Sequence, residues 1–279
     1  MKIPKLLFGT SGIPFTTPSP NTINGIKHVR ELGLDAMELA FVRSVNINPE
    51  LAEKVNAERK KQNVTLTCHG QYFINLSSLE PEKVVASKER ILNAVNAANN
   101  CGVWSTTFHA GYYMKQSPEI VYNKIKSGMK EVIKLMQDKS IDMWLRPETT
   151  GKASQWGHYK EIVDLSEEVE QVLPCFDFAH VHARQQKHNT LEEFREILNY
   201  TEKKLGRTAL NNMHIHMAGI KYSEKGERRH LELDDSDFNY KDWIKVWKEF
   251  KLKGVVISES PNIEFDGLKM KEYWDKLNM

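Results

Sequence analysis

The sequence predicts an α/β protein: a single (β/α)8 barrel domain over residues 1–279, with a metal site at the C-terminal ends of the strands. Eight short apolar or β-branched runs recur along the chain, and a stretch with the helical spacing of apolar residues follows each run. No linker rich in proline or serine interrupts the series, which favours one closed barrel over two domains. An open doubly wound sheet is the alternative, but the sequence lacks a phosphate-binding loop of the G-x-x-x-x-G-K-S/T type.

Strands and helices alternate in order along the chain. The predicted strands cover residues 6–12, 36–41, 64–70, 105–110, 142–148, 172–180, 212–218 and 254–260. The predicted helices cover residues 21–33, 48–62, 81–102, 117–137, 159–171, 190–206, 240–254 and 266–278. Several of these helices begin at a capping residue or a proline and end at a glycine, as helix ends prefer.

Composition indicates an ordinary soluble protein, with 40% hydrophobic and 27% charged residues. No apolar run approaches the roughly 20 residues that a membrane span needs, and the first residues lack the long apolar region of a signal peptide. Cys68, Cys101 and Cys175 lie too far apart in the sequence for a disulfide scaffold or a zinc ribbon, so we expect a cytoplasmic protein. A net charge of +2 argues against coating nucleic acid by bulk electrostatics, although residues 219–230 are locally basic.

Histidines and carboxylates gather near the ends of the predicted strands, where the functional rim of such a barrel lies. Each residue alone is more often a hydrogen-bonded structural residue. Burying so many together would cost roughly several kcal/mol per unpaired ion unless something satisfied them. Zn²⁺ and Mn²⁺ accept this set of imidazole and carboxylate ligands, and the lack of a thiolate set disfavours a structural zinc site. The residues are His69, His109, Glu148, Asp177, His180, His214, His216, His230 and Glu259.

Seven segments of the sequence carry these residues. They are HGQYFINLSS from His69, FHAGYY around His109, RPETTGKASQWG around Glu148, FDFAH around Asp177 and His180, MHIHMAGIKY around His214, RRH ending at His230, and ISESP around Glu259. In this order they resemble the signature segments of the endonuclease IV family of apurinic/apyrimidinic endonucleases, whose members have a xylose-isomerase-like TIM barrel. The resemblance runs from about Gly9 to Pro261, which is nearly the whole chain.

The resemblance implies a zinc-dependent phosphodiesterase that cleaves DNA on the 5′ side of abasic sites in base excision repair, with Glu148 and Glu259 as the catalytic carboxylates. Closely spaced zinc ions can lower the pKa of a bridging water and neutralise the leaving oxygen. Two zinc ions are expected, and manganese is a possible substitute. The implied ligands are His69 and His109 for one ion, Glu148 as a bridge, Asp177, His214 and Glu259 for the second ion, and His180 and His230 for a third.

The resemblance also implies a partner, which is double-stranded DNA containing abasic sites, bound by a monomer. Tyr72 matches an aromatic position that the family places against DNA, so it is the candidate for filling the gap of the lost base. Arg43 is a candidate for intercalation or phosphate contact. Lys152 and the basic loop that holds Arg228 could contact phosphates, which position a duplex without reading its sequence.

Two departures from the family pattern affect these expectations. Where the family usually has Asp two residues before the loop histidine, this chain has Arg228 before His230. Either the third zinc is lost or weakened, with Arg228 supplying some of its charge, or a neighbour replaces the ligand. The candidate neighbours are His182, His216, Glu227 and Asp234. The family's His-Pro-Gly is His109-Ala110-Gly111 in this chain, which should alter the stiffness of the loop more than metal binding.

Two other functions remain open at the level of sequence. A metal-dependent sugar isomerase or epimerase would share the barrel and would place a Glu or Asp beside a carbonyl for proton transfer. It would typically use fewer ligands than this set of histidines offers. A non-catalytic protein that binds damaged DNA is the other alternative, because the third metal site could be broken at Arg228.

Overall fold

Eight parallel strands form the centre of the molecule in this computed structural model, which describes residues 2–279. The strands are hydrogen-bonded in the order β6-β4-β3-β2-β1-β12-β9-β8. Isolated bridges from Leu145 to Val172 and from Glu148 to Cys175 join β6 to β8, so the sheet is a nearly closed barrel. The strands are β1 (Leu6–Ser11), β2 (Ala36–Ala40), β3 (Thr65–His69), β4 (Ser105–Phe108), β6 (Trp144–Pro147), β8 (Cys175–Asp177), β9 (Met213–Met217) and β12 (Gly254–Ser258).

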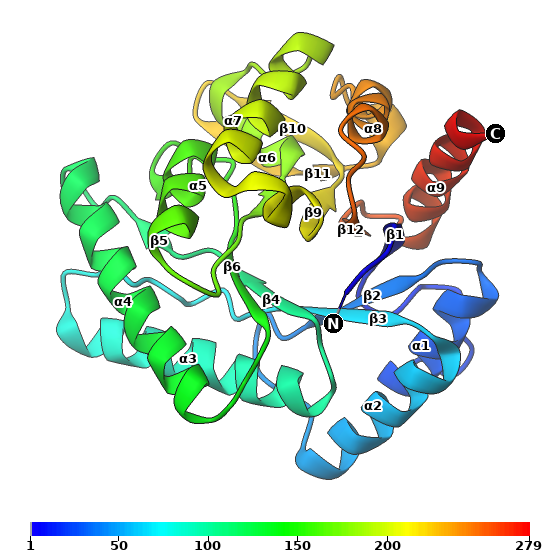
Figure 1. Cartoon of the computed structure of the whole chain (residues 1–279), viewed down its shortest axis with the longest axis horizontal. Coiled ribbons are helices and arrows are strands. Elements are labelled where there is room, and N and C mark those ends of the chain that lie inside the picture. Colours follow the sequence, from blue (N-terminus) through cyan, green and yellow to red (C-terminus); the bar gives the residue numbers. More distant parts are fainter. Residues whose placement is uncertain (1) are drawn as a thin grey trace.

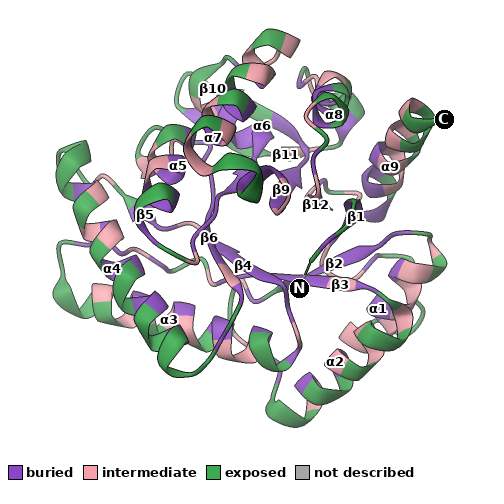
Figure 2. Cartoon of the chain, viewed as in Figure 1, coloured by how far each residue is buried: buried purple, intermediate pink, exposed green. Residues whose placement is uncertain are grey.

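Helices surround this barrel and bury their apolar faces against it (Figure 1). Burial follows the same plan, with buried residues along the strands and on the inner faces of the helices (Figure 2). Asn48 and Ser117 cap their helices as predicted, each followed by a proline in the first turn. Within residues 2–279 the helices are α1 (Thr22–Glu31), α2 (Pro49–Gln62), α3 (Pro81–Asn100), α4 (Pro118–Asp138), α5 (Tyr159–Glu168), α6 (Phe178–Gln185), α7 (Leu191–Leu210), α8 (Tyr240–Glu249) and α9 (Glu264–Asn278).

The predicted barrel is confirmed, and a strand forms within each of the eight predicted ranges. The sixth strand differs, because β8 ends at Asp177 instead of continuing to residue 180. The Asp177 side chain accepts a hydrogen bond of 2.7 Å from the backbone N–H of His180, which caps the start of α6. His180 and His182 therefore lie on a short helix and not on a strand.

Additional short elements cover the C-terminal ends of the strands. The predicted basic loop after β9 is a hairpin of β10 (Gly219–Ser223) and β11 (Gly226–Leu231), followed by the 3₁₀-helix η1 (Leu233–Asp235). A smaller antiparallel pair, β5 (Gly111–Tyr112) with β7 (Gln155–Trp156), joins the loops after β4 and β6. Among the described residues, no helix is long and apolar enough to cross a membrane.

Candidate metal centre

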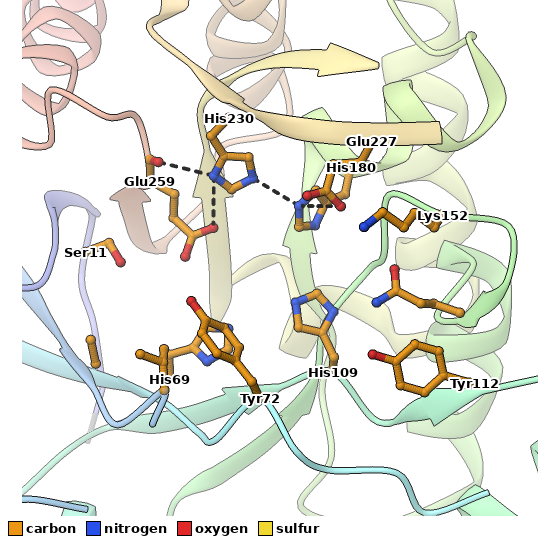
Figure 3. Close-up of a pocket in the computed structure, with 13 residues that line it drawn as sticks. Ser11, His69, Tyr72, His109, Tyr112, Lys152, His180, Glu227, His230 and Glu259 are labelled. Carbon is orange, nitrogen blue, oxygen red and sulfur yellow. Dashed lines mark hydrogen bonds and ion pairs between the residues drawn. The ribbon is translucent and has the colours of Figure 1, made fainter. Parts of the chain in front are cut away.

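The polar rim predicted from the sequence surrounds a cavity of about 600 Å³ (Figure 3). Parallel strands place their C-terminal ends on one side of the barrel, and the chain puts a histidine or a carboxylate at five of these ends. The polar rim is therefore built by residues that are up to 190 positions apart in the sequence, and three of the five, His69, His109 and Glu259, line the cavity itself. The five residues are His69 at the end of β3, His109 after β4, Glu148 after β6, Asp177 at the end of β8 and Glu259 after β12.

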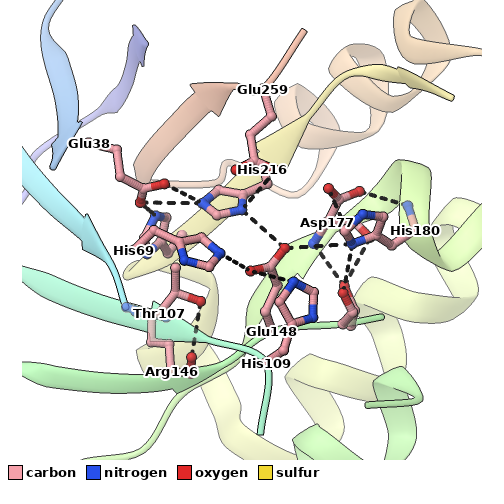
Figure 4. Close-up of polar contacts among 12 residues, drawn as sticks. Glu38, His69, Thr107, His109, Arg146, Glu148, Asp177, His180, His216 and Glu259 are labelled. Atoms are coloured by element: carbon pink, nitrogen blue, oxygen red, sulfur yellow. Dashed lines mark hydrogen bonds and ion pairs between the residues drawn. The ribbon is translucent and has the colours of Figure 1, made fainter. Parts of the chain in front are cut away.

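Glu148 lies at the centre of the polar contacts on this rim (Figure 4). Its Oε2 atom is 3.2 Å from His69 Nε2 and 3.8 Å from His109 Nε2. Its Oε1 atom is 3.2 Å from His216 Nδ1 on the opposite side. Because the side chain is only 1% exposed, water does not compensate this carboxylate. Glu148 can thus contribute one oxygen to an ion beside His69 and His109, and the other to an ion beside His216.

His216, and not His214, lies beside these carboxylates, although the resemblance implied His214 as the ligand from the seventh strand. Both side chains point into the barrel because they are two residues apart on β9. His216 pairs in register with Asp177, at the end of β8, whereas His214 pairs with Cys175, one layer deeper. His216 Nδ1 lies 3.5 Å from Glu259 Oε2. Depth along the strand therefore decides which histidine reaches the rim.

Both ring nitrogens of His214 already have partners. Nδ1 lies 2.8 Å from Ser105 Oγ, and Nε2 lies 3.1 Å from Glu38 Oε2. Burial lowers the pKa of His214 to about 4, and the nearby Glu38 only partly opposes this shift. We expect a neutral, hydrogen-bonded histidine inside the barrel rather than a metal ligand.

A third set of donors lies on the side of α6 and β11. His180 Nε2 is 3.0 Å from His230 Nε2, and Asp177 Oδ2 is 3.8 Å from that same His230 nitrogen. His180 Nδ1 also lies 3.0 Å from the carbonyl oxygen of Thr149. That oxygen can only accept, so Nδ1 carries a proton and the neutral ring presents a lone pair at Nε2.

Three of these donor groups have a composition that fits divalent metal ions, and they share carboxylates. In each group the donor atoms lie within 4.8 Å of one another. Glu148 belongs to the first and second groups, and Asp177 belongs to the second and third. Among residues 2–279, Glu148 Oε2, Asp177 Oδ2 and His109 Nδ1 are buried without a hydrogen-bond partner. The groups are His69, His109 and Glu148; Glu148, Asp177, His216 and Glu259; and Asp177, His180 and His230.

The electrostatics of the rim favour positive charge. Burial opposes protonation of His69, but the facing Glu148 carboxylate, together with Glu38 and Glu259, outweighs it and raises the pKa of His69 to about 9. Burial likewise opposes protonation of His180, but Asp177 and Glu227 raise its pKa to about 9. The same carboxylates that retain protons on these rings would retain divalent cations in their place.

Glu38 on β2 is a candidate site residue that the sequence reasoning missed. Its Oε1 lies 3.1 Å from His216 Nε2, and its Oε2 accepts a hydrogen bond of 2.9 Å from Thr67 Oγ1. The side chain is fully buried. A carboxylate that holds one nitrogen of a histidine turns the other nitrogen toward a metal ion. A lone carboxylate in the apolar strand AMELAF was the available signal.

The other residues named from the sequence lie at different distances from the cavity. Tyr72 is 56% exposed and lines the cavity, as does Lys152. Arg43 is exposed on the loop after β2, and its carbonyl oxygen accepts a hydrogen bond from the Gln71 side chain. Arg228 is exposed, and its Nε donates to Ser223 Oγ on the hairpin. Arg228 is thus not among the residues that line the cavity.

His182 lies outside the metal groups. Its Nδ1 lies 2.8 Å from the Lys187 carbonyl oxygen, and its ring packs against Tyr222 and Phe238. Through these contacts His182 packs α6 against the segments that follow β9. Asp234 is paired with Lys269 at 2.9 Å. Neither residue is placed to replace the aspartate that the resemblance leads us to expect before His230 and that this chain lacks.

Comparison with known proteins places the chain in a family. Residues 26–276 match the family described as xylose isomerase-like TIM barrel, and the chain belongs to this family. An uncharacterized protein of Methanocaldococcus jannaschii is 39% identical over 273 residues, which cover 98% of each chain.

Solved structures with the same fold include a nuclease and a protein similar to an epimerase. Endonuclease IV from Thermus thermophilus is 18% identical, with a TM-score of 0.75 over 96% of this chain and 98% of that chain. A D-tagatose 3-epimerase-like protein is 17% identical, with a TM-score of 0.74 over 96% of this chain and 98% of that chain. At these identities the likeness shows the fold alone, so the site has to indicate the function.

Proposed function

We propose that the protein is a metal-dependent phosphodiesterase that hydrolyses the DNA backbone on the 5′ side of abasic sites, with zinc as the expected metal. The observation that carries this proposal is the sharing of Glu148 and Asp177 among three adjacent groups of metal donors. Shared carboxylates hold ions close together, and closely spaced divalent ions suit the displacement at a phosphodiester. The likeness of fold to endonuclease IV agrees with this proposal.

Glu148 and Glu259 would have different roles in this reaction. When bound, the metal ions would supply a hydroxide near neutral pH and neutralise charge on the phosphate and the leaving oxygen. Glu148 would fix the spacing of two ions through its two oxygens. Glu259, whose side chain is 14% exposed, lines the cavity and can hold an ion and accept a proton from the attacking water.

A sugar epimerase is the second candidate, because one group of donors would suffice for it. Glu148, Asp177, His216 and Glu259 could hold a single ion beside a carbonyl, with the two glutamates available for proton transfer. This reading leaves no metal role for His69 and His109, or for His180 and His230. The nuclease explains why these additional imidazoles are buried beside the same carboxylates.

DNA recognition would use residues at the mouth of the cavity. The ring of Tyr72 lies edge-on to that of His69, with 6.1 Å between ring centroids, and more than half of the side chain is exposed. Such a ring could occupy the gap of a missing base and guide the extruded sugar to the metal ions. Lys152 is exposed on the opposite rim, where it could contact a phosphate.

The decisive experiment uses the metal-loaded protein and a duplex with one tetrahydrofuran abasic analogue. We expect a single nick 5′ to the lesion, lost on chelation and restored by zinc or manganese. Glu259→Gln should lower the nicking rate at least 100-fold because it removes a negatively charged metal ligand. Glu272→Gln on the exposed face of α9 is the matched control and should leave the rate unchanged.

Two results would contradict the nuclease. Selective binding of the abasic duplex without any nick under zinc or manganese would indicate a DNA-damage binding protein. Intact DNA together with metal-dependent epimerisation of a ketose would support the second candidate.

A further inference from the structure

The hairpin that carries His230 contains an irregularity in its register. Arg229 pairs with Lys221, but the next pair toward the turn is Glu227 with Tyr222, so Arg228 is an extra residue in β11. An extra residue of this kind is a β-bulge, and it shifts the alternation of side chains along the strand. In a regular strand Arg228 would share the face of His230. With the bulge, Glu227 takes this face and Arg228 is exposed.

Glu227 reaches the third group of donors on this face. Its Oε2 lies 3.5 Å from His180 Nε2, and its side chain is 20% exposed and lines the cavity (Figure 3). Lys152 lines the cavity on the same side, and Arg228 does not line it. Arg228, which stands where the resemblance leads us to expect an aspartate, is exposed outside the cavity, while its neighbour Glu227 lines it.

The histidines of this group face each other in an arrangement that requires a cation between them. His230 Nδ1 lies 3.2 Å from the carbonyl oxygen of Glu259, and His180 Nδ1 lies 3.0 Å from that of Thr149. Each Nδ1 must donate, so the neutral rings present lone pairs at their two Nε2 atoms, which are only 3.0 Å apart. Lone pairs at this distance repel each other unless a proton or a metal ion lies between them.

Two glycines hold Glu227 in this position. The backbone N–H of Glu227 donates to the Gly151 carbonyl oxygen at 2.9 Å. A Cβ atom on Gly151 would lie 2.5 Å from Glu227 Cβ and 2.7 Å from Glu227 Oε2, so only glycine leaves room for this carboxylate. Gly226 has φ +89° and lies against the same carbonyl oxygen. The hairpin is thus fixed against the loop after β6.

We infer that Glu227, brought into the site by the bulge at Arg228, is a ligand of a third metal ion together with His180, His230 and Asp177. The donor atoms are 3.0 Å apart for His180 and His230, 3.5 Å for His180 and Glu227, and 3.8 Å for His230 and Asp177. Ligands about 2.0 to 2.2 Å from a tetrahedral zinc ion are roughly 3.3 to 3.6 Å apart. Asp177 Oδ2 is fully buried and lacks a hydrogen-bond partner among residues 2–279, so it is free to bind the ion.

This inference deepens the proposed function and rests on its metal-binding part. The family pattern of an aspartate two residues before the histidine becomes a glutamate three residues before it. The one-residue bulge compensates for the change in spacing. The third site is therefore retained with a different ligand, and Arg228 has no part in it.

The test is to count metal ions in the full-length protein after zinc loading and dialysis against metal-free buffer. We expect about three equivalents in the wild type and one equivalent fewer in Glu227→Gln. Competition with a chromogenic chelator should show at least a tenfold loss of affinity at that site. Glu224→Gln, at an exposed position of the same hairpin, and Arg228→Ala should both retain all the ions.

A second variant protects the test against a folding defect. Gly151→Ala keeps the carboxylate in the chain but forces it out of position, and it should lose the same equivalent. The inference is overturned if folded Glu227→Gln keeps every ion at unchanged affinity, or if the wild type binds no more than two. Nicking of abasic DNA is measured separately, so that failure of the third metal site can be told apart from failure of the proposed nuclease function. A protein that loses one ion in Glu227→Gln but never nicks abasic DNA refutes the nuclease and supports the third site.

Discussion

Single residues decide how the rim is positioned, and Glu38 is the clearest case. It is held by Thr67 and His214 and holds His216 in turn, so its charge fixes which nitrogen of His216 faces Glu148 and Glu259. Burial opposes ionisation of Glu38, but the two histidines outweigh it and hold its pKa well below its usual range. We therefore expect the carboxylate to be charged at neutral pH.

We predict that Glu38→Gln weakens zinc binding by about 10 to 100-fold, because His216 loses the partner that orients it. Metal titration of the purified variant measures this effect. Glu53→Gln, on the exposed side of α2, is the matched control. Unchanged zinc affinity in a folded Glu38→Gln protein would show that His216 is oriented without this carboxylate.

The residue scale also shows what the sequence could not resolve. The period of two along a strand predicts that His214 and His216 share a face, but it does not give their depth in the barrel. Depth depends on the stagger between β8 and β9, which is a property of the assembled sheet. His69, His109, Glu148 and Glu259 were easier to place, because each lies at the end of a strand or directly after it.

At the scale of elements, helix α7 offers a test of local capping. Thr190 and Glu193 form a reciprocal capping box, and the Glu193 carboxylate also accepts from the backbone N–H of Asn189 at 3.0 Å. Burial would raise the pKa of Glu193, but these hydrogen bonds outweigh it and lower the pKa to about 2. The pKa is therefore lower in the folded chain than in the unfolded chain, where it is near 4.5.

Because the folded pKa is the lower one, this stabilisation is present above about pH 4.5 and disappears as the pH falls toward 2. We predict that Glu193→Gln lowers the free energy of unfolding by about 1 kcal/mol at neutral pH. The difference from wild type should shrink as the pH falls below about 4. Urea unfolding at several pH values measures it. A difference that does not vary with pH would mean that the charge of Glu193 has no role.

Elements that depend on tertiary contacts were harder to predict than the capped helices. The first three residues of the segment FAHVHARQ were predicted as the end of the strand at residues 172–180, although Asp177 before them is a good capping residue. The bulge at Arg228 leaves no sequence signal of its own, because it is fixed by the contact of Gly226 with the loop after β6. The spacing of Glu227 and His230 indicates a shared site only once this contact is known.

At the scale of the whole molecule, three carboxylates are buried at one end of the barrel, those of Glu38, Glu148 and Asp177. Burial raises the pKa of Asp177, and the neighbouring His180 and His230 only partly oppose this. Divalent ions bound beside these carboxylates would offset their negative charge. Because the ions bind the folded state, they would stabilise it by mass action. The net charge of +2 is an average over the whole chain, so it does not indicate that carboxylates are concentrated at the site.

We therefore predict that removing the metal ions lowers the melting temperature by roughly 10 °C, since each bound ion can add about 3 to 4 kcal/mol at excess metal. Calorimetry with and without chelator measures the change, and added zinc should reverse it. Glu259→Gln should show a smaller drop because it holds fewer ions. A melting temperature that stays within about 1 °C on chelation would show that the cluster does not bind metal ions.

The alternation of strands and helices predicted the barrel because each unit follows from local patterns and short connections. The closure of the barrel is less regular than this pattern suggests. Between β6 and β8, the ring is completed by isolated bridges, one of which is the pairing of Glu148 with Cys175. Glu148 is thus both the proposed bridging ligand and part of the place where the barrel closes.

At this place, metal binding would also affect the stability of the barrel itself. An ion held by Glu148, directly after β6, and by Asp177, at the end of β8, would link two neighbouring strands that are joined only by isolated bridges. Local opening of the barrel should then begin at this seam when the ions leave. The protein would then lose the geometry of the candidate metal centre and the rigidity of the barrel in the same step.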